Sequence, residues 1–328
     1  ADPLLTWLQE RQLLPAGFWP PGILVRDAIL ARAAWLQQAI QPDGLVRMRL
    51  QSQTDDMMTS YNNMAWDFAT DVRLVDAAEA ERHLTEMLTR AGYDMPLFMR
   101  DTVAALYARM GRFDQAVWWQ EACVAEVADQ PINPQQQSEL ADYRRRLQRY
   151  RAGEATIEHE ADEAAVVQER SYPDGQLHTR STIRGGQPNG RWESWHPNGA
   201  IAERGWMKDG QRVGHWEQHG PDGKLRSLGS YYQGRRVGPW RTYDAAGRLF
   251  SQGSYLWAPL AAASRIGAWS WHDVAGNPQI TGWYSRDQPF GPWHRRQDDG
   301  SWQDIPANDL VLPRLDDQGR RVANSANP

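Results

Sequence analysis

The chain has 328 residues, a formal net charge of −5 at pH 7 and a sequence pI of about 5.9. This balance argues against a nucleic-acid-binding protein held mainly by phosphate contacts. The single cysteine, Cys123, excludes an intrachain disulfide and a cysteine-based zinc cluster, and no apolar run reaches the roughly 18 residues of a spanning helix. The start Ala1-Asp2-Pro3 favours a mature protein on the periplasmic or cell-surface side, with a cytoplasmic protein as the alternative.

Residues 1–152 show the period of amphipathic helices. A first apolar stripe consists of Ile29, Ala33, Leu36 and Ile40. Two later stretches each predict a helix, a turn and a second helix, and SELADYRRRLQRYRAGEA predicts a polar helix that caps the stack. The two helix pairs have comparable residues at corresponding positions: Met64, Ala65, Phe68 and Ala80 in one, and Val103, Ala104, Tyr107, Phe113, Ala116 and Cys123 in the other, with Gly111 at the turn. This pattern resembles tetratricopeptide repeats, so we expect a tetratricopeptide-like helical solenoid.

Cys123 lies at one of the small helical positions, and no flanking group is present that would lower the pKa of its thiol. A core residue is therefore favoured over a nucleophile. Residues 153–170 are expected to form an acidic linker and a first strand. Glu158, His159, Glu160 and Asp162 are metal-ligand types, but their position in a linker favours a solvated segment over a metal site.

The second half of the chain repeats a Gly-x-Trp motif. Its tryptophans, Trp192, Trp216, Trp240, Trp269 and Trp293, are spaced 24, 24, 29 and 24 residues apart. Turn glycines, among them Gly199, Gly223 and Gly247, follow the same period, and so do Gly205, Gly229, Gly253 and Gly282. Each unit contains two turn signals separated by about eight residues that suit a strand. We therefore expect successive β-hairpins that pair edge to edge into one elongated antiparallel sheet.

Stacking of equivalent hairpins aligns their side chains in columns. One column is expected to contain Leu177, Ile201, Leu225 and Leu249, and another Met207, Tyr231, Tyr255 and Tyr284. The column of small glycines is expected to let a neighbouring indole lie on the backbone. Because a single sheet has no thick core, the five tryptophans are interpreted as structural, together with the turn glycines Gly199, Gly223 and Gly247.

Residues 171–303, which begin with SYPDGQLHTRSTIRGGQPNGRWESWHPNGAI, resemble the MORN-variant repeat of bacterial proteins, some of which are described as antitoxin-like or immunity-like. The fourth unit departs from the pattern by an insertion at residues 256–266. Residues 304–328 are expected to be a frayed C-terminal tail. The predicted fold class is α+β in two domains, a helical solenoid followed by stacked hairpins.

No catalytic, cofactor-binding or metal-binding constellation is predicted. His215 to His219 (HWEQH) lacks the helical His-Glu-x-x-His spacing of zinc proteases, and neither GRRVG nor RGGQPNG has the context or the lysine of a phosphate loop. Repeat proteins ordinarily bind through extended surfaces. The expectation is a protein that is not an enzyme and carries no cofactor.

Candidate partner contacts stand three residues after each repeated tryptophan, where strand alternation places them on the face opposite the indoles: Trp195, His219, Tyr243, His272 and Arg296. The alternative is an ordinary second face that packs on the helical half. Trp257 and Leu260 of the insertion are further candidates, because apolar residues in an insertion need a cover.

Both resemblances imply contact with another protein, so the leading expectation is a non-enzymatic scaffold, adaptor or accessory subunit of a bacterial complex. The alternative is an immunity-type protein that occludes one toxin. Association with membrane lipid is less favoured and would be indirect, because the repeats carry no basic cluster. No nucleic-acid partner is expected.

Overall fold

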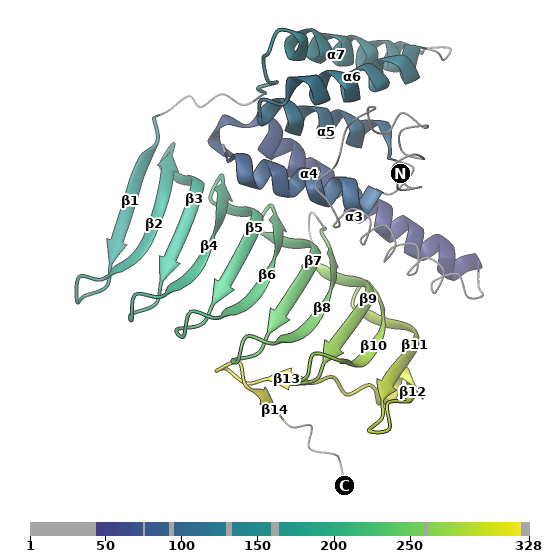
Figure 1. Cartoon of the computed structure of the whole chain (residues 1–328), viewed down its shortest axis with the longest axis vertical. Helices are drawn as coiled ribbons and strands as arrows, with labels where there is room; N and C mark the ends of the chain where they lie inside the picture. Colours follow the sequence, from purple (N-terminus) through teal and green to yellow (C-terminus); the bar gives the residue numbers. More distant parts are fainter. Residues whose placement is uncertain are drawn as a thin grey trace, which may run out of the picture. The chain divides into compact units, whose positions relative to one another are not determined.

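The structure is a computed structural model that describes residues 44–74, 76–91, 95–128, 133–158, 164–258 and 262–322. Over these residues five α-helices precede a 12-stranded antiparallel sheet, which confirms the α+β class and the hairpin sheet (Figure 1). The chain divides into two compact units, Ala1–Asp43 with Asn62–Glu160, and Gly44–Tyr61 with Ala161–Pro328. The predicted stripe from Ile29 to Ile40 lies outside the described residues.

The helices follow one another along the chain: α3 (Gly44–Thr70), η1 (Val72–Leu74), α4 (Ala77–Ala91), α5 (Leu97–Arg109), α6 (Phe113–Ala128) and α7 (Pro134–Arg151). Gly111 ends the α5 segment with a φ of 73°, a conformation that favours glycine. The predicted core positions are buried, as Met64, Ala65, Phe68, Ala80, Val103, Ala104, Tyr107, Ala116 and Cys123 show. Phe113 is half-buried.

A buried ion pair connects α5 with α7. The Asp101 carboxylate accepts from Arg146 Nε at 2.9 Å and from Gln120 Nε2 at 3.0 Å. The Arg146 guanidinium also lies 5.3 Å from the ring centres of Trp66 and Tyr143. Burial raises the pKa of Asp101 despite the attraction of Arg146. The pair therefore connects the helices through a carboxylate that is largely buried.

Glu158 of the acidic linker is exposed, as expected for a solvated segment, and it also binds the helical unit. Its backbone N–H donates to the carbonyl of Thr70 at 3.1 Å, and its carboxylate accepts from Trp66 Nε1 at 2.7 Å. The indole N–H needs an acceptor where it lies, and the linker carboxylate supplies it. His159, Glu160 and Asp162 lie outside the described residues.

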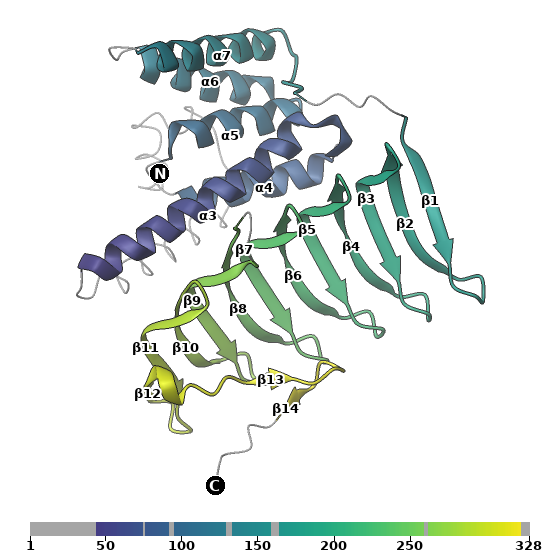
Figure 2. The same ribbon diagram turned by 180° about the vertical axis from the view of Figure 1, so that it is seen from behind.

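The strands follow chain order across the sheet, each antiparallel to the next (Figures 1 and 2). They are β1 (Val166–Ser171), β2 (Leu177–Arg184), β3 (Gln187–Trp195), β4 (Ile201–Lys208), β5 (Gln211–His219), β6 (Leu225–Tyr232), β7 (Arg235–Tyr243), β8 (Leu249–Leu256), β9 (Ser264–His272), β10 (Pro278–Ser285), β11 (Gln288–Arg296) and β12 (Trp302–Ile305).

Two kinds of turn alternate along the sheet. At one end, pairs such as Asp209 and Gly210 both have positive φ (50° and 74°), as two-residue hairpin turns require. At the other end only the glycine is left-handed, as at Gly199, Gly223 and Gly247. There the preceding Asx side chain accepts a backbone N–H, for example Asp222 Oδ1 from Lys224 N at 3.1 Å. We call this second end the turn edge.

The glycine column lies directly beneath the indoles, as predicted. A β-carbon at Gly205, Gly229, Gly253 or Gly282 would approach the indole of Trp216, Trp240, Trp269 or Trp293 to between 2.1 and 2.3 Å. Tyrosines fill the spaces between the indoles in edge-to-face contact, for example Tyr231 with Trp240 at 5.1 Å and 89°. This chain of rings defines the indole face of the sheet, and such contacts add about 0.5–1.5 kcal/mol each beyond burial.

Arginine side chains cover the indole rings on the side away from the glycine backbone. Arg212 lies 4.4 Å from the ring centre of Trp216, and Arg236 lies 4.5 Å from that of Trp240. Each guanidinium also donates to the tyrosine hydroxyl of the following hairpin, as Arg236 does to Tyr255 at 3.1 Å. The indoles therefore lie between glycine backbone and guanidinium, and Trp216 is only 1% exposed although the sheet is a single layer.

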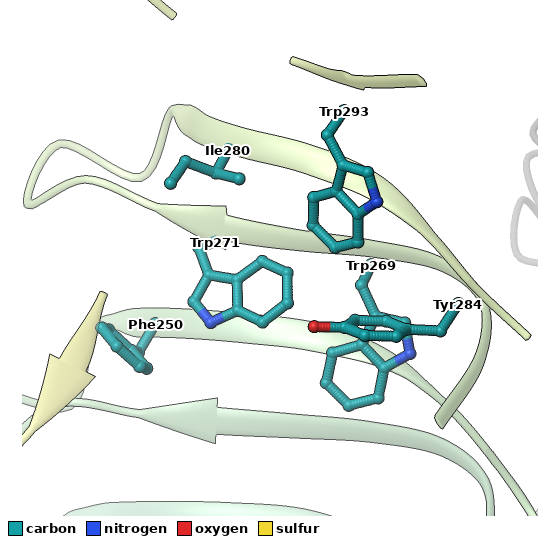
Figure 3. Packing of buried hydrophobic residues seen from close by; sticks show 6 residues of the cluster. All are labelled: Phe250, Trp269, Trp271, Ile280, Tyr284 and Trp293. Carbon is teal, nitrogen blue, oxygen red and sulfur yellow. The ribbon is translucent and has the colours of Figure 1, made fainter. Parts of the chain in front are cut away.

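The C-terminal segment corrects the expectation of a frayed tail. Residues 307–322 form η2 (Ala307–Asp309) and a short hairpin of β13 (Arg314–Leu315) and β14 (Arg321–Val322), which we call the C-terminal hairpin. Leu310, Leu312 and Leu315 pack on a buried cluster of the last repeats, shown in Figure 3: Phe250, Trp269, Trp271, Ile280, Tyr284 and Trp293. Alternating leucines supply the apolar side that a frayed tail would lack.

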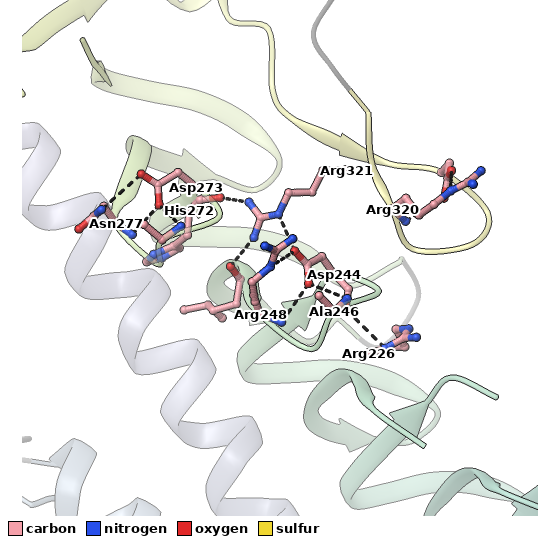
Figure 4. Close-up of polar contacts among 12 residues, drawn as sticks. Arg226, Asp244, Ala246, Arg248, His272, Asp273, Asn277, Arg320 and Arg321 are labelled. Atoms are coloured by element: carbon pink, nitrogen blue, oxygen red, sulfur yellow. Dashed lines mark hydrogen bonds and ion pairs between the residues drawn. The ribbon is translucent and has the colours of Figure 1, made fainter. Parts of the chain in front are cut away.

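One carboxylate anchors the C-terminal hairpin to the sheet (Figure 4). Asp244 is 1% exposed and accepts from Arg321 Nε at 2.7 Å and from Arg248 Nε at 2.9 Å. Arg321 also donates to the carbonyls of Leu249 and His272, and its guanidinium lies 5.3 Å from the ring centre of Phe250. The hairpin is thus held by ionic, backbone and apolar contacts together.

Candidate interaction surface

The predicted contact residues lie in register at the turn edge. Trp195, His219, Tyr243, His272 and Arg296 are the last residues of β3, β5, β7, β9 and β11. Trp195 pairs with Ile201, His219 with Leu225, and Tyr243 with Leu249. Residues directly opposite in antiparallel strands share a face, so aromatic and aliphatic side chains alternate across the strands.

These residues lie on the outer face, opposite the indoles. His215, Glu217 and His219 alternate with Trp216 along β5, and the Glu217 carboxylate lies 4.0 Å and 3.8 Å from the two imidazoles. Seven half-buried residues of the outer face form what we call the outer strip: Leu177, Trp195, Ile201, His219, Leu225, Tyr243 and Leu249. The strip is continuous from β2 to β8.

Members of the predicted row differ in how they are held. The guanidinium of Arg180 lies 5.6 Å from the ring centre of Trp195. Burial lowers the pKa of His219, which keeps its imidazole neutral at pH 7, and the side chain retains 16% exposure. Tyr243 and Arg296 are half-buried. The strip thus presents rings rather than free charges.

His272 fits the contact row least well. It is 6% exposed, its Nε2 is 2.9 Å from Ser270 Oγ, and its Nδ1 is 3.1 Å from the carbonyl of Gly276. Both ring nitrogens are therefore occupied by the protein's own turn. The outer strip ends before this residue.

The insertion packs partly on its own sheet. Trp257 is half-buried and its ring centre lies 5.2 Å from that of Tyr232 in the preceding hairpin. Arg235 donates to the carbonyl of Ala258 at 2.6 Å, which fixes the start of the inserted loop. Leu260 lies outside the described residues.

Several residues that shape the sheet were not singled out from the sequence. An arginine precedes three of the repeated tryptophans by four residues: Arg212, Arg236 and Arg265. This regular spacing in the sequence indicates that these arginines belong to the repeat. Asp316 to Gly319 repeats the turn of Asp244 to Gly247, which signalled structure in the C-terminal segment. The anchoring of Arg321 on Asp244, 77 residues away, left no local signal.

Within the described ranges, no three His, Cys, Asp or Glu side chains are grouped closely enough to hold a metal ion. Burial, chiefly, raises the pKa of the Cys123 thiol, which opposes formation of the thiolate. None of the helices among the residues described has both the length and the apolar character needed to span a bilayer. No protein-family model and no curated protein matches this chain.

Proposed function

We propose that the protein is a non-enzymatic, protein-binding scaffold or accessory subunit that combines tetratricopeptide-like helices with MORN-like hairpin repeats. The observation that supports this proposal most is the outer strip, an aligned row of half-buried aromatic, imidazole and aliphatic groups at the turn edge. Aromatic residues are enriched at the centres of protein interfaces, where a neutral surface costs little to desolvate.

The division of labour between the two faces supports the same role. On the indole face the rings are buried against glycine, tyrosine and arginine. Trp216 and Trp240, for example, are 1% and 2% exposed. On the outer face Trp195 and Tyr243 keep accessible ring surface. A rigid single-layer sheet that holds such rings in register needs little reordering when a partner binds.

The test is affinity capture from the native host with a double variant, Trp195→Ser with Tyr243→Ser. The control is Val274→Ser, since Val274 is 59% exposed and lies in a turn outside the strip. The proposal predicts that one set of proteins is captured by the wild type and the control and lost from the double variant. Equal recovery of the same partners by the wild type, the control and the double variant would show that the outer strip does not bind them.

The number of captured partners decides between the two versions of this role. Several partners of moderate affinity favour a scaffold. A single stoichiometric partner whose toxicity is neutralised by binding favours the immunity-type alternative, with affinity near the nanomolar range, about −12 kcal/mol.

A further inference from the structure

Strand β1 stands where the second strand of a repeat stands, and among the described residues no first strand of that repeat pairs with it. Ser171, the last residue of β1, stands 24 residues before Trp195, the last residue of β3. The corresponding strands of the later repeats are β3, β5, β7, β9 and β11, and each of them pairs with a neighbouring strand on both sides. Over the described residues β1 pairs with β2 alone, and it forms one border of the sheet in Figure 1.

The stretch that the period assigns to the missing strand belongs to the helical unit. One period before β2 (Leu177–Arg184) lie residues 153–160. Thr156 Oγ1 donates to Tyr150 Oη at 3.1 Å, the Ala155 carbonyl accepts from Arg149 NH2 at 3.1 Å, and Glu158 is bound to Thr70 and Trp66. Ala155, Thr156 and Glu158 are thus bound within the helical unit, and none of them pairs with β1.

The open edge has the exposure of a docking strand. All six residues of β1 are exposed, and the adjacent Val166 and Val167 are 61% and 62% exposed. Proteins ordinarily protect an edge strand by shortening or covering it. The opposite border, β12, has only four residues and is followed by Pro306. The two borders thus differ: β12 is short and followed by proline, whereas β1 carries six exposed residues.

A ladder of alternating charges on the outer face begins at this edge. Arg180 Nε lies 2.7 Å from Glu169 Oε1, and its NH1 lies 4.0 Å from Glu193 Oε2. Glu193 is directly opposite Arg204, which in turn pairs with Glu217 at 2.6 Å. The sequence of charges from the edge inward is therefore negative, positive, negative, positive, negative. A basic residue is the group that would extend it outward.

We propose that the edge of β1 receives an extended segment of a protein partner, antiparallel to β1, with an arginine or lysine opposite Glu169. Main-chain hydrogen bonds supply affinity in this mode of binding and the facing side chains supply specificity. The chain's own residues 153–160 suit the position poorly, because Thr156 stands where Arg180 and Arg204 stand in the repeats and Glu154 and Glu158 add negative charge. The inference rests on the proposed protein-binding function but concerns a surface separate from the outer strip.

The test uses a labelled peptide with the sequence of β4, IAERGWMK, whose arginine pairs with Glu217 in the sheet. Its matched control replaces that arginine by glutamate. Binding is measured by fluorescence anisotropy with the full chain, and hydrogen exchange of residues 166–171 locates the site. We expect the arginine peptide to bind about tenfold more tightly than the glutamate peptide and to slow exchange in β1.

Two variants keep the result interpretable. Glu169→Arg should invert the preference between the peptides, and Glu169→Gln should abolish it, while unchanged circular dichroism shows that each variant is folded. A preference that survives both variants, or slowed exchange only outside β1, would overturn the proposal. Sedimentation of the chain alone gives a further test. A dimer that forms with the wild type and dissociates with Glu169→Arg would also overturn the proposal, because the edge of β1 would then bind a second copy of the chain. Loss of partner capture through the outer strip would leave these outcomes unaffected.

Discussion

The indole of Trp269 lies on the backbone of Gly253 so closely that a β-carbon there would be 2.1 Å from Cδ2. The same relationship joins Gly229 with Trp240, one repeat earlier. A sheet without a second layer is held together by this contact, by the tyrosines between the indoles and by the guanidinium groups above them. The buried clusters of the second half are therefore built from the rings of successive repeats, and the C-terminal segment adds its leucines to the last of them.

Gly253→Ala should destabilise the sheet by about 3 kcal/mol, since neither the backbone nor the fixed ring can retreat from a new methyl group. Chemical denaturation followed by tryptophan fluorescence measures the effect. Ser254→Ala, at the next position of β8, is the matched control and should change the free energy of unfolding by less than about 0.5 kcal/mol. Equal effects of the two substitutions would mean that the ring does not lie on the glycine.

Arg236→Ala should cost about 1–2 kcal/mol, because it removes a guanidinium stacked on Trp240 and a hydrogen bond to Tyr255. Arg236→Lys should recover only part of this loss, since an ammonium group cannot stack as a plane. Thermal unfolding of both variants is compared with that of Arg241→Ala, an exposed arginine of the same strand. Full rescue by lysine would show that charge alone, without stacking, accounts for the contact.

The C-terminal hairpin should leave the sheet in acid. Burial works to raise the pKa of Asp244, but hydrogen bonds from Arg321 and Arg248 outweigh it and hold the pKa below its usual value. A carboxyl with a lowered folded-state pKa stabilises the fold above its unfolded pKa, about 3.9, and loses that contribution as pH falls through the folded value. Methyl NMR signals of Leu312 and Leu315 should therefore keep their packed shifts from pH 7 to about 4 and lose them below.

Arg321→Met should release the C-terminal hairpin at neutral pH, as protonation of Asp244 does in acid. It should weaken the docking of the hairpin by about 2 kcal/mol at pH 7, since it removes a charged donor from a buried acceptor. Arg320→Met is the control, because Arg320 is 66% exposed and pairs with Asp316 inside the hairpin turn. Packed leucine signals in both variants at pH 7 would refute the anchoring role of Asp244 and Arg321.

In the helical unit, Arg146→Met should destabilise the fold by about 3–5 kcal/mol at pH 7, because Asp101 is left buried and charged. An acid whose folded-state pKa is raised gains a proton more readily in the folded protein, so stability should return as pH falls. Adding Asp101→Asn should restore much of the loss at pH 7. Denaturation midpoints at pH 5 and pH 7 that fall equally for Arg146→Met would contradict this explanation.

The repeat period made most of the sheet predictable. Equal spacing of the tryptophans and of the small glycines requires equivalent neighbours, so the contact between Gly205 and Trp216 could be expected from the sequence alone. The alternation of strand residues likewise placed Trp195 and His219 on the face away from the indoles. Local patterns of this kind survive in any fold that repeats them.

Contacts outside the period could not be predicted in the same way. The burial of His272 depends on Ser270 and on the turn carbonyl of Gly276, and neither bond follows a spacing rule. The docking of Arg321 on Asp244 joins the last hairpin to a repeat 77 residues earlier, a distance that sequence patterns do not encode. The binding of Glu158 by Trp66 is likewise a tertiary contact, made across 92 residues.

The outer strip is the surface that we propose for binding of another protein. Hydrogen exchange of the wild-type chain, alone and with its captured partner, tests it most directly. We expect slower exchange at the turn-edge ends of β3 to β8, where Trp195, His219 and Tyr243 lie. Exchange there that is the same with and without the partner, with slowing confined to the helices, would contradict it.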